Sequence, residues 1–305
     1  MNYQLKFDSA SAYELVTSFM IYFTKKWTRN LEIGSAWIKH VDQLVPESFR
    51  KSSPQVNVFD YYDYLFLLAW KCPQKDTPKQ FIEWLSSLSS GQIYEILSPF
   101  ITGSIPSNLD VIPTEFAPLL AQWDSYYFQT LDPSLDRHIA SDIQQKQLLL
   151  QSMDGVKLVE LSTCGVVIEP QNGLDEIILI PTLHFRPLNN YMRFERMVLM
   201  QYSLDPPHLD PNTPPPQLMR LTRALADESR VRILKFIAAS PKSFSEISEF
   251  SALTKGTVHH HMMNLRAAGL IRIHVTTAQN HMERFSFRTD ALDNVPFWLN
   301  QFINQ

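Results

Sequence analysis

The sequence predicts a predominantly helical α+β protein: an N-terminal domain, residues 1–205, a linker, residues 206–216, and a C-terminal domain, residues 217–305. Three observations predict this organisation. The chain of 305 residues is longer than one hydrophobic core usually serves. Six of the twelve residues in 205–216 are proline. Apolar residues on both sides of this segment recur mainly at helical spacing, with a few β-branched runs between them.

The proline-rich segment should form an extended, semi-rigid spacer. Proline has no amide donor and fixes φ, so the segment cannot join the interior of a helix or a sheet. All eleven tyrosines precede it, and a basic excess follows it, so the composition changes where the chain geometry changes. A proline-rich recognition ligand is the alternative interpretation.

In the N-terminal domain, apolar side chains at helical spacing predict several buried helical stripes. The run within 59–70 is apolar almost all round, which predicts a helix central to the domain. Another helix is expected from Ser134, a possible N-cap, to Leu150. The stripes comprise Leu15, Phe19, Tyr22 and Phe23, then Phe81, Trp84, Leu85 and Leu88, then Phe116, Leu119, Leu120 and Trp123.

After residue 150, β-branched runs predict four strands, at 156–161, 165–169, 176–180 and 197–203. Asn172-Gly173 lies between the second and third runs. Because this dipeptide favours two-residue hairpin turns, a hairpin is expected there. The domain is therefore expected to consist of helices followed by a small β segment.

The C-terminal domain contains start and stop signals for four successive helices. Asp227 is a suitable N-cap for the second helix, Ser243 and Glu246 form a capping box at the third, and Thr254 caps the fourth. Gly269 permits the left-handed turn that ends the fourth helix. Side chains expected to be buried are Leu218, Leu221, Leu225, Val231, Ile233, Leu234, Ile237, Ala238, Phe244, Ile247 and Phe250. The alternating segments 271–275 and 283–288 predict a two-stranded wing with its tip at 276–282.

The helix predicted at 254–268 has two distinct sides at about 100° per residue. Val258, Met262 and Leu265 fall on one side, with His261 at its edge. Three consecutive imidazoles on a regular helix point in different directions, so the histidine triplet is not expected to hold a metal ion. The residues expected to approach DNA are Lys255, Gly256, Thr257, His259, His260 and Asn264. Simple solvent exposure is the alternative for the two histidines.

Charge is distributed unevenly along the chain. The net charge is -4, yet 217–289 holds 11 basic and 5 acidic residues, leaving 16 basic and 26 acidic residues elsewhere. This asymmetry places positive potential on the C-terminal domain, as expected for a module that approaches nucleic acid.

Several functional classes are disfavoured by what the sequence lacks. The two cysteines, Cys72 and Cys164, are far apart and lack metal-ligand spacing, so reduced thiols in a cytoplasmic protein are expected. We find no secretory leader, no apolar stretch long enough to span a membrane, and no glycine-rich phosphate loop or nucleophile elbow. The expectation is a non-enzymatic protein without cofactor or metal.

Residues 218–289 resemble an ArsR-type winged helix-turn-helix domain. The match rests on ALADESRVRILKFI, on SEISEFSALTKGTVHHHMMNLRAAGLI and on the basic wing that follows. The resemblance implies a homodimeric repressor that reads the major groove of an operator with the helix 254–268 and contacts phosphates or the minor groove with the wing 271–288. It adds the arginines Arg272 and Arg284 as candidate DNA contacts, and gives Arg230 a bracing role.

Departures from the family pattern bear on the signal. The third helix lacks the cysteine pair of metal-sensing members, and the last helix has no histidine, so metal sensing is not expected. That last helix is apolar, with Trp298, Leu299 and Phe302, and is expected to pack in a dimer interface or on the other domain. The N-terminal domain loosely resembles the long extensions of some Bacillus-type members, through YQLKFDSASAYELVTSFMIY and its β-rich segment.

The aromatic N-terminal domain is a candidate sensor of a small-molecule effector. Apolar pockets combine aromatic walls with a few polar tips, although core packing is the alternative for each residue. The candidate lining residues are Tyr61, Tyr64, Trp84, Trp123 and Tyr127. A second hypothesis makes the winged helix a protein-interaction module and assigns ligand binding or enzymatic activity to the N-terminal domain.

Overall fold

The computed structural model describes residues 3–25, 27–52, 54, 56–207, 210–275 and 283–304. The chain divides into two compact units. The N-terminal unit comprises Tyr3–Ile143 and Gly173–Leu204, and the winged unit comprises Gln144–Asn172 and Asp205–Gln305. The boundary at 204/205 coincides with the start of the proline-rich segment, but residues 144–172 cluster with the C-terminal part of the chain.

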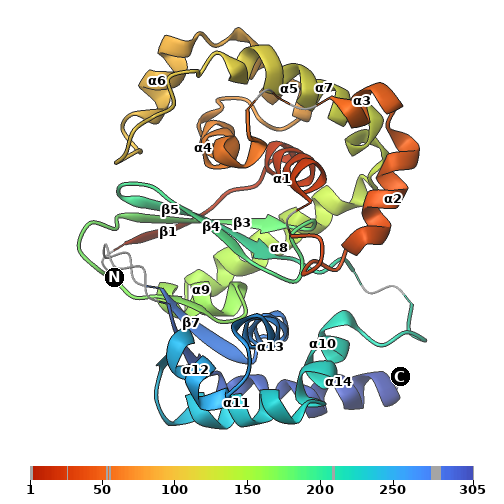
Figure 1. The fold of residues 1–305 in the computed structure, drawn as a ribbon, viewed down its shortest axis with the longest axis vertical. Helices are drawn as coiled ribbons and strands as arrows, with labels where there is room; N and C mark the ends of the chain where they lie inside the picture. The colour runs from red at the N-terminus through yellow and green to blue at the C-terminus, as the bar shows by residue number, and fades with distance from the viewer. Residues whose placement is uncertain are drawn as a thin grey trace. The chain divides into compact units, whose positions relative to one another are not determined.

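The N-terminal unit contains a four-stranded sheet of order β1-β3-β5-β4. β1 is parallel to β3 and β3 to β5, whereas β4 is antiparallel to β5. Helices α1, α4, α5 and α7 lie on one side of this sheet (Figure 1). The strands are β1 (Gln4–Phe7), β3 (Glu176–Thr182), β4 (Asn190–Arg193) and β5 (Met197–Ser203). The helices are α1 (Ser11–Thr24), α2 (Gly34–Leu44), α3 (Glu47–Lys51), α4 (Tyr62–Lys71), α5 (Pro78–Ser87), α6 (Ser90–Leu97) and α7 (Ala117–Tyr126), followed by α8 (Ser134–Leu150), which continues into the winged unit.

The predicted helical stripes of the N-terminal unit lie mostly in one hydrophobic core. Phe19, Phe81, Phe116 and Trp123 are completely buried, together with strand residues such as Ile178. The predicted helix from Ser134 to Leu150 is α8, but its first amide is capped by Asp132, whose Oδ1 accepts a hydrogen bond from Ser134 N (2.8 Å). The helical periodicity therefore located the core of this unit.

Two predictions about the β segment are wrong. Residues 156–161 lie in helix α9 (Gly155–Ser162), because Asp154 caps Val156 N (2.9 Å) and Leu158, Val159 and Ser162 bury one helical face. The predicted hairpin is absent as well. Asn172-Gly173 forms a turn with φ +88° at Gly173, but the strands on its two sides, β2 (Val166–Ile168) and β3, belong to different sheets.

The winged unit contains the predicted succession of helices and wing strands. Its elements are α9, β2, α10 (Pro216–Leu225), α11 (Glu228–Ala239), β6 (Lys242–Ser243), α12 (Phe244–Ser251), α13 (Lys255–Ala267), β7 (Ile271–Val275), β8 (Arg284–Phe287) and α14 (Asn294–Ile303). β7 and β8 are antiparallel, and β6 pairs with β8. The predicted wing tip, 276–282, lies outside the described residues. All three predicted N-caps form, with Asp227, Ser243 and Thr254 each accepting a backbone amide hydrogen bond.

Three apolar side chains of α11 and α12 were assigned to the wrong side. The buried face of α11 is formed by Ile233, Leu234 and Ile237, whereas Val231 and Ala238 are exposed. In α12 only Ile247 is fully buried. Phe250 is exposed and stacks on Phe236 of α11, with ring centroids 4.0 Å apart. Surface stacking thus accounts for an apolar residue that the periodicity assigned to the core.

Strand β2 extends the sheet of the wing, which the sequence did not predict. It pairs in parallel with β7, so the sheet order is β2-β7-β8-β6. Gly165, just before β2, has φ +130°, and an added Cβ there would lie 2.3 Å from the Ile271 carbonyl oxygen. A side chain at this position is therefore incompatible with the observed approach of the two backbones.

Gly165→Ala is expected to destabilise the winged unit by about 1–3 kcal/mol, because it combines backbone strain with a backbone clash. Denaturant unfolding followed by circular dichroism measures the change. Gly173→Ala is the matched control, since Gly173 also has positive φ but no atom within 4 Å of a built Cβ. Equal effects of the two substitutions would contradict the importance of the β2–β7 approach.

The α+β, predominantly helical class is confirmed. Within the described ranges, every helix is too short or too polar to cross a lipid bilayer. Both cysteines are free thiols.

Candidate nucleic-acid interface

The turn between α12 and α13 is built by backbone geometry and one side-chain cap. Ala252 ends α12 in the left-handed conformation, with φ 54°. Thr254 then caps α13 by accepting a hydrogen bond from Thr257 N (3.2 Å). At the other end of α13, Gly269 has φ +66°, as its predicted C-terminal role requires. Caps at both ends fix where α13 begins and stops.

The buried side of α13 is the one that the rotation predicts. Val258 and Leu265 are completely buried, and Met262 and His261 nearly so. The His261 Nδ1 atom lies 3.9 Å from Asp227 Oδ1 and has no hydrogen-bond partner. His261 is thus a core-edge residue, unlike the two histidines before it.

The opposite side of α13 presents polar groups to solvent. Lys255, Gly256, Thr257, His259 and His260 are exposed. Asn264, which is partly buried, donates to the His260 carbonyl oxygen (2.8 Å) and lies 3.1 Å from His260 Nε2. The Thr257 hydroxyl lies 2.9 Å from the Thr254 hydroxyl. These contacts within the helix hold hydroxyl, imidazole and amide groups in defined positions on one surface.

Gly256 contributes no side chain to the first turn of this surface. A Cβ built at Gly256 would meet no atom within 4 Å, so the fold itself does not require glycine there. Glycine inside a helix costs about 0.5–1 kcal/mol relative to alanine. Its presence at an exposed site without steric need is consistent with close approach of another molecule to the backbone.

Residues 227–272, which contain α11, α12 and α13, match the family model described as bacterial regulatory protein, arsR family. This segment is similar to an ArsR-type helix-turn-helix. Two solved structures are similar to parts of the chain. The match to the ArsR family transcriptional regulator RHA00566 has 24% sequence identity and a TM-score of 0.25, and it covers 29% of this chain and 93% of the regulator's chain. The match to HlyU from Vibrio cholerae N16961 has 21% sequence identity and a TM-score of 0.23, and it covers 29% of this chain and 94% of the HlyU chain. No curated protein matches the chain.

The two wing arginines of the winged unit differ in their availability. Arg272 donates from Nε to Glu160 (2.6 Å) and from Nη2 to Asp290 (3.1 Å), and its side chain is only 27% exposed. Arg284 donates to the Pro241 carbonyl oxygen (2.7 Å) and lies 3.4 Å from Glu246 Oε2, but its side chain remains 46% exposed. The structure therefore commits Arg272 to an ion-pair network that joins β7 to α9, and leaves Arg284 more accessible.

Arg230, in the first turn of α11, joins this helix to α10. Its Nε donates to the Ala224 carbonyl oxygen (2.8 Å) and its Nη2 to that of Arg223 (2.7 Å), both at the end of α10. The guanidinium thus satisfies helix-terminal carbonyls that have no partner within α10. This geometry agrees with the bracing role implied by the resemblance.

The aromatic residues predicted as a ligand pocket pack instead against their neighbours. Trp123 is completely buried and donates to Ser18 Oγ (3.0 Å), while Tyr61 and Tyr127 are nearly buried. Tyr64 and Trp84 are partly buried and pack on the core. None of the five lines the cavity that opens in the N-terminal unit, which is formed by residues that the sequence did not single out. Across the described residues, no group of His, Cys, Asp or Glu side chains is arranged to hold a metal ion.

Proposed function

We propose that the protein is a sequence-specific regulator of transcription that binds double-stranded operator DNA in the cytoplasm and acts as a homodimeric repressor. A small molecule bound by the N-terminal unit would release it. The observation that carries the proposal is the capped, exposed side of α13 within the ArsR-type segment, where polar groups of the kind that read base edges lie together.

Each exposed group of α13 has a role in this proposal. Lys255 neutralises a phosphate, Gly256 lets the helix backbone come close, and Thr257, His259, His260 and Asn264 approach base edges in the major groove. Arg284 adds a phosphate contact from the wing. Arg272, held by Glu160 and Asp290, is assigned to the integrity of the wing sheet rather than to DNA.

The last helix, α14, supports the proposed homodimer. It packs against α10, yet Phe297 is 58% exposed and Ile303 66% exposed. Apolar side chains in such positions are costly in a monomer and favourable in a two-fold symmetric interface. We therefore propose that α14 of one protomer faces α14 of its partner.

Phe297→Asp combined with Ile303→Asp is expected to raise the dimer dissociation constant by about 30-fold or more, since two apolar contacts of a buried interface are each worth about 1 kcal/mol or more. Sedimentation velocity over a concentration series measures this change. Asn300→Asp combined with Asn304→Asp adds the same two charges to α14 without removing apolar groups. If neither double variant changes the dimer dissociation constant, the interface lies elsewhere.

Selection from a random duplex library tests sequence-specific binding and does not require the operator to be known. The proposal predicts enrichment of a pseudo-palindrome whose half-sites lie about one helical turn, roughly 34–36 Å, apart. A winged helix that serves only as a protein-interaction module would enrich no sequence. The selected duplex also provides the probe for the measurements below.

A further inference from the structure

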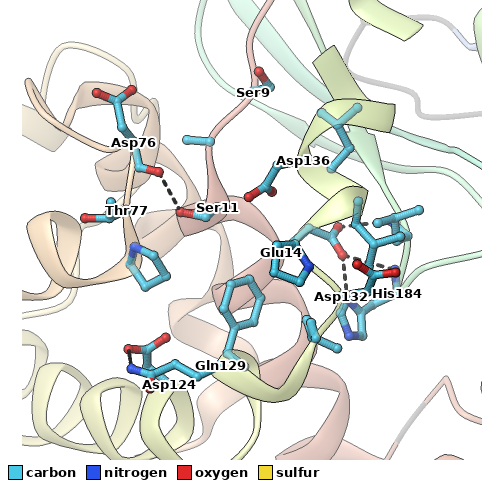
Figure 2. A pocket seen from close by; sticks show the side chains of 18 of the residues that line it. Ser9, Ser11, Glu14, Asp76, Thr77, Asp124, Gln129, Asp132, Asp136 and His184 are labelled. Carbon is cyan, nitrogen blue, oxygen red and sulfur yellow. Dashed lines mark hydrogen bonds and ion pairs between the residues drawn. The ribbon is translucent and has the colours of Figure 1, made fainter. Parts of the chain in front are cut away.

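A half-open cavity of about 560 Å³ lies within the N-terminal unit. Its wall is built from α1, the start of α5, the end of α7 and the segment after it, the first turns of α8 and the end of β3. Figure 2 shows side chains from these elements converging on one space, with Glu14 and His184 on one side and Asp124 on another. This volume suits a small organic ligand.

The Glu14 carboxylate at this cavity is fully engaged by the protein. Its oxygens accept hydrogen bonds from the Thr182 hydroxyl and from the Leu183 and His184 amides, and it forms an ion pair with the His184 ring. The other ring nitrogen of His184 lies 2.7 Å from the Tyr127 hydroxyl. Glu14 and His184 therefore form a structural pair and leave little capacity for a ligand.

Asp124 lines the same cavity and differs from Glu14 in this respect. Its Oδ2 accepts a hydrogen bond from Gln129 Nε2 (3.0 Å). Its Oδ1 is buried without a hydrogen-bond partner, and the residue as a whole is only 9% exposed. A buried carboxylate oxygen without a donor is unfavourable, because it has lost its hydrogen bonds to water and gained none from the protein. A ligand that brings a donor to this oxygen would remove that penalty.

The remaining lining residues favour a cationic ligand with an apolar body. Three further carboxylates, Asp76, Asp132 and Asp136, stand at the exposed edge of the cavity, where Lys79 is the single lysine or arginine among the lining residues. Apolar walls are supplied by side chains such as Phe128, Ile139 and Leu183. Acidic groups beside apolar walls match an ammonium group attached to a hydrocarbon or aromatic body, and they disfavour carboxylates and phosphates.

We propose that this cavity binds an amphipathic organic amine, with its ammonium group donating to Asp124 and its apolar body against the walls. The role of this amine as the effector rests on the proposed function, in which a small molecule bound by the N-terminal unit releases the repressor. The chain leads from the cavity-lining start of α8 through α9 to β2, the strand that pairs with wing strand β7.

Fluorescence titration of the full chain with dansylcadaverine, a primary amine on a naphthalene body, tests the proposal. We expect saturable binding at one site per chain with a blue shift of the emission. The N-acetylated dansylcadaverine, which is neutral but has the same body, should bind at least about tenfold more weakly, because it lacks the charged donor for Asp124. Asp124→Asn should weaken amine binding by a similar factor.

Matched variants separate this site from general charge effects and from misfolding. Glu95→Gln removes an exposed carboxylate of α6 away from the cavity and should leave the affinity unchanged. Asp136→Asn, at an exposed position of the rim, should weaken binding without affecting folding. Three results would each overturn the proposal. The first is equal affinity of the chain for dansylcadaverine and its acetylated form, and the second is an unchanged affinity of Asp124→Asn for dansylcadaverine. The third is the absence of saturable binding of either dansylcadaverine or phenylbutylamine. Because no DNA is present, each of these results leaves the proposed DNA binding standing.

Discussion

Thr257→Ala combined with His260→Ala is expected to weaken binding to the selected duplex by about 30-fold or more. Side-chain contacts to base edges are each worth about 1–3 kcal/mol of discrimination, and the variant removes two of them. Both side chains are exposed on α13, so the substitutions should not change the fold. Fluorescence anisotropy with the selected duplex and with a scrambled duplex measures the loss of specific binding.

His40→Ala combined with Ser240→Ala is the matched control for this variant. It removes an exposed imidazole and an exposed hydroxyl that lie outside α13. We expect it to bind the selected duplex as the unmodified chain does. Equal affinity of the α13 variant and this control would remove α13 from the recognition surface.

Glu14→Gln is expected to destabilise the N-terminal unit by about 3–5 kcal/mol at neutral pH. The substitution breaks a buried ion pair and leaves His184 without its anionic partner. Urea unfolding followed by tryptophan fluorescence is a suitable measurement, because five of the six tryptophans belong to this unit. Glu95→Gln, an exposed position on α6, serves as control and should change the stability little.

The same pair predicts a pH dependence of stability. Burial raises the pKa of Glu14, but the nearby His184 ring and the hydrogen bonds to the carboxylate outweigh burial, so the pKa lies below its usual value. A carboxyl whose pKa is lower in the folded state stabilises the fold above its unfolded pKa of about 4.3, and this contribution is lost as the pH falls through the folded pKa. Glu14→Gln should therefore show a smaller loss of stability on acidification below about pH 4.5. An identical pH profile for the variant would show that this pair does not contribute.

Helix α13 was predictable because its signals are local. Thr254, Gly269 and the Val258, Met262, Leu265 stripe each act within a few residues, and all three features form as expected. The capping box of Ser243 and Glu246 is local in the same sense. Where local signals competed, as in 156–161, the β-branched composition suggested a strand, whereas the Asp154 cap and one-sided burial produced a helix.

Pairings between distant segments were not predictable from the sequence. The contact of β2 with β7 joins residues about a hundred positions apart in the chain, and Gly165 carries no local sign that it approaches Ile271. The same holds for Arg272, whose partner Glu160 lies in a helix that the sequence assigned to a strand. A basic residue on a wing strand looks available for phosphates until its acidic partner is known.

The five predicted aromatic residues lie outside the proposed ligand cavity for a related reason. Aromatic residues suggested a pocket, but Trp123 and Tyr127 have the size and shape that fill a core, and they do so. The cavity is lined by short polar and apolar residues from separate parts of the chain, such as Ser11, Asp124 and Ile139. Only their juxtaposition in the fold, and the unpartnered oxygen of Asp124, distinguish them from ordinary surface residues.

The dependence of DNA affinity on salt tests most directly whether α13 docks on operator DNA. The logarithm of the binding constant for the selected duplex should fall linearly with the logarithm of salt concentration. Lys255→Ala should reduce that slope by about one, and Lys235→Ala, which removes an exposed lysine from α11, should not change it. Salt-independent binding, or equal slopes for the two lysine variants, would contradict the assignment of α13 as the DNA-reading helix.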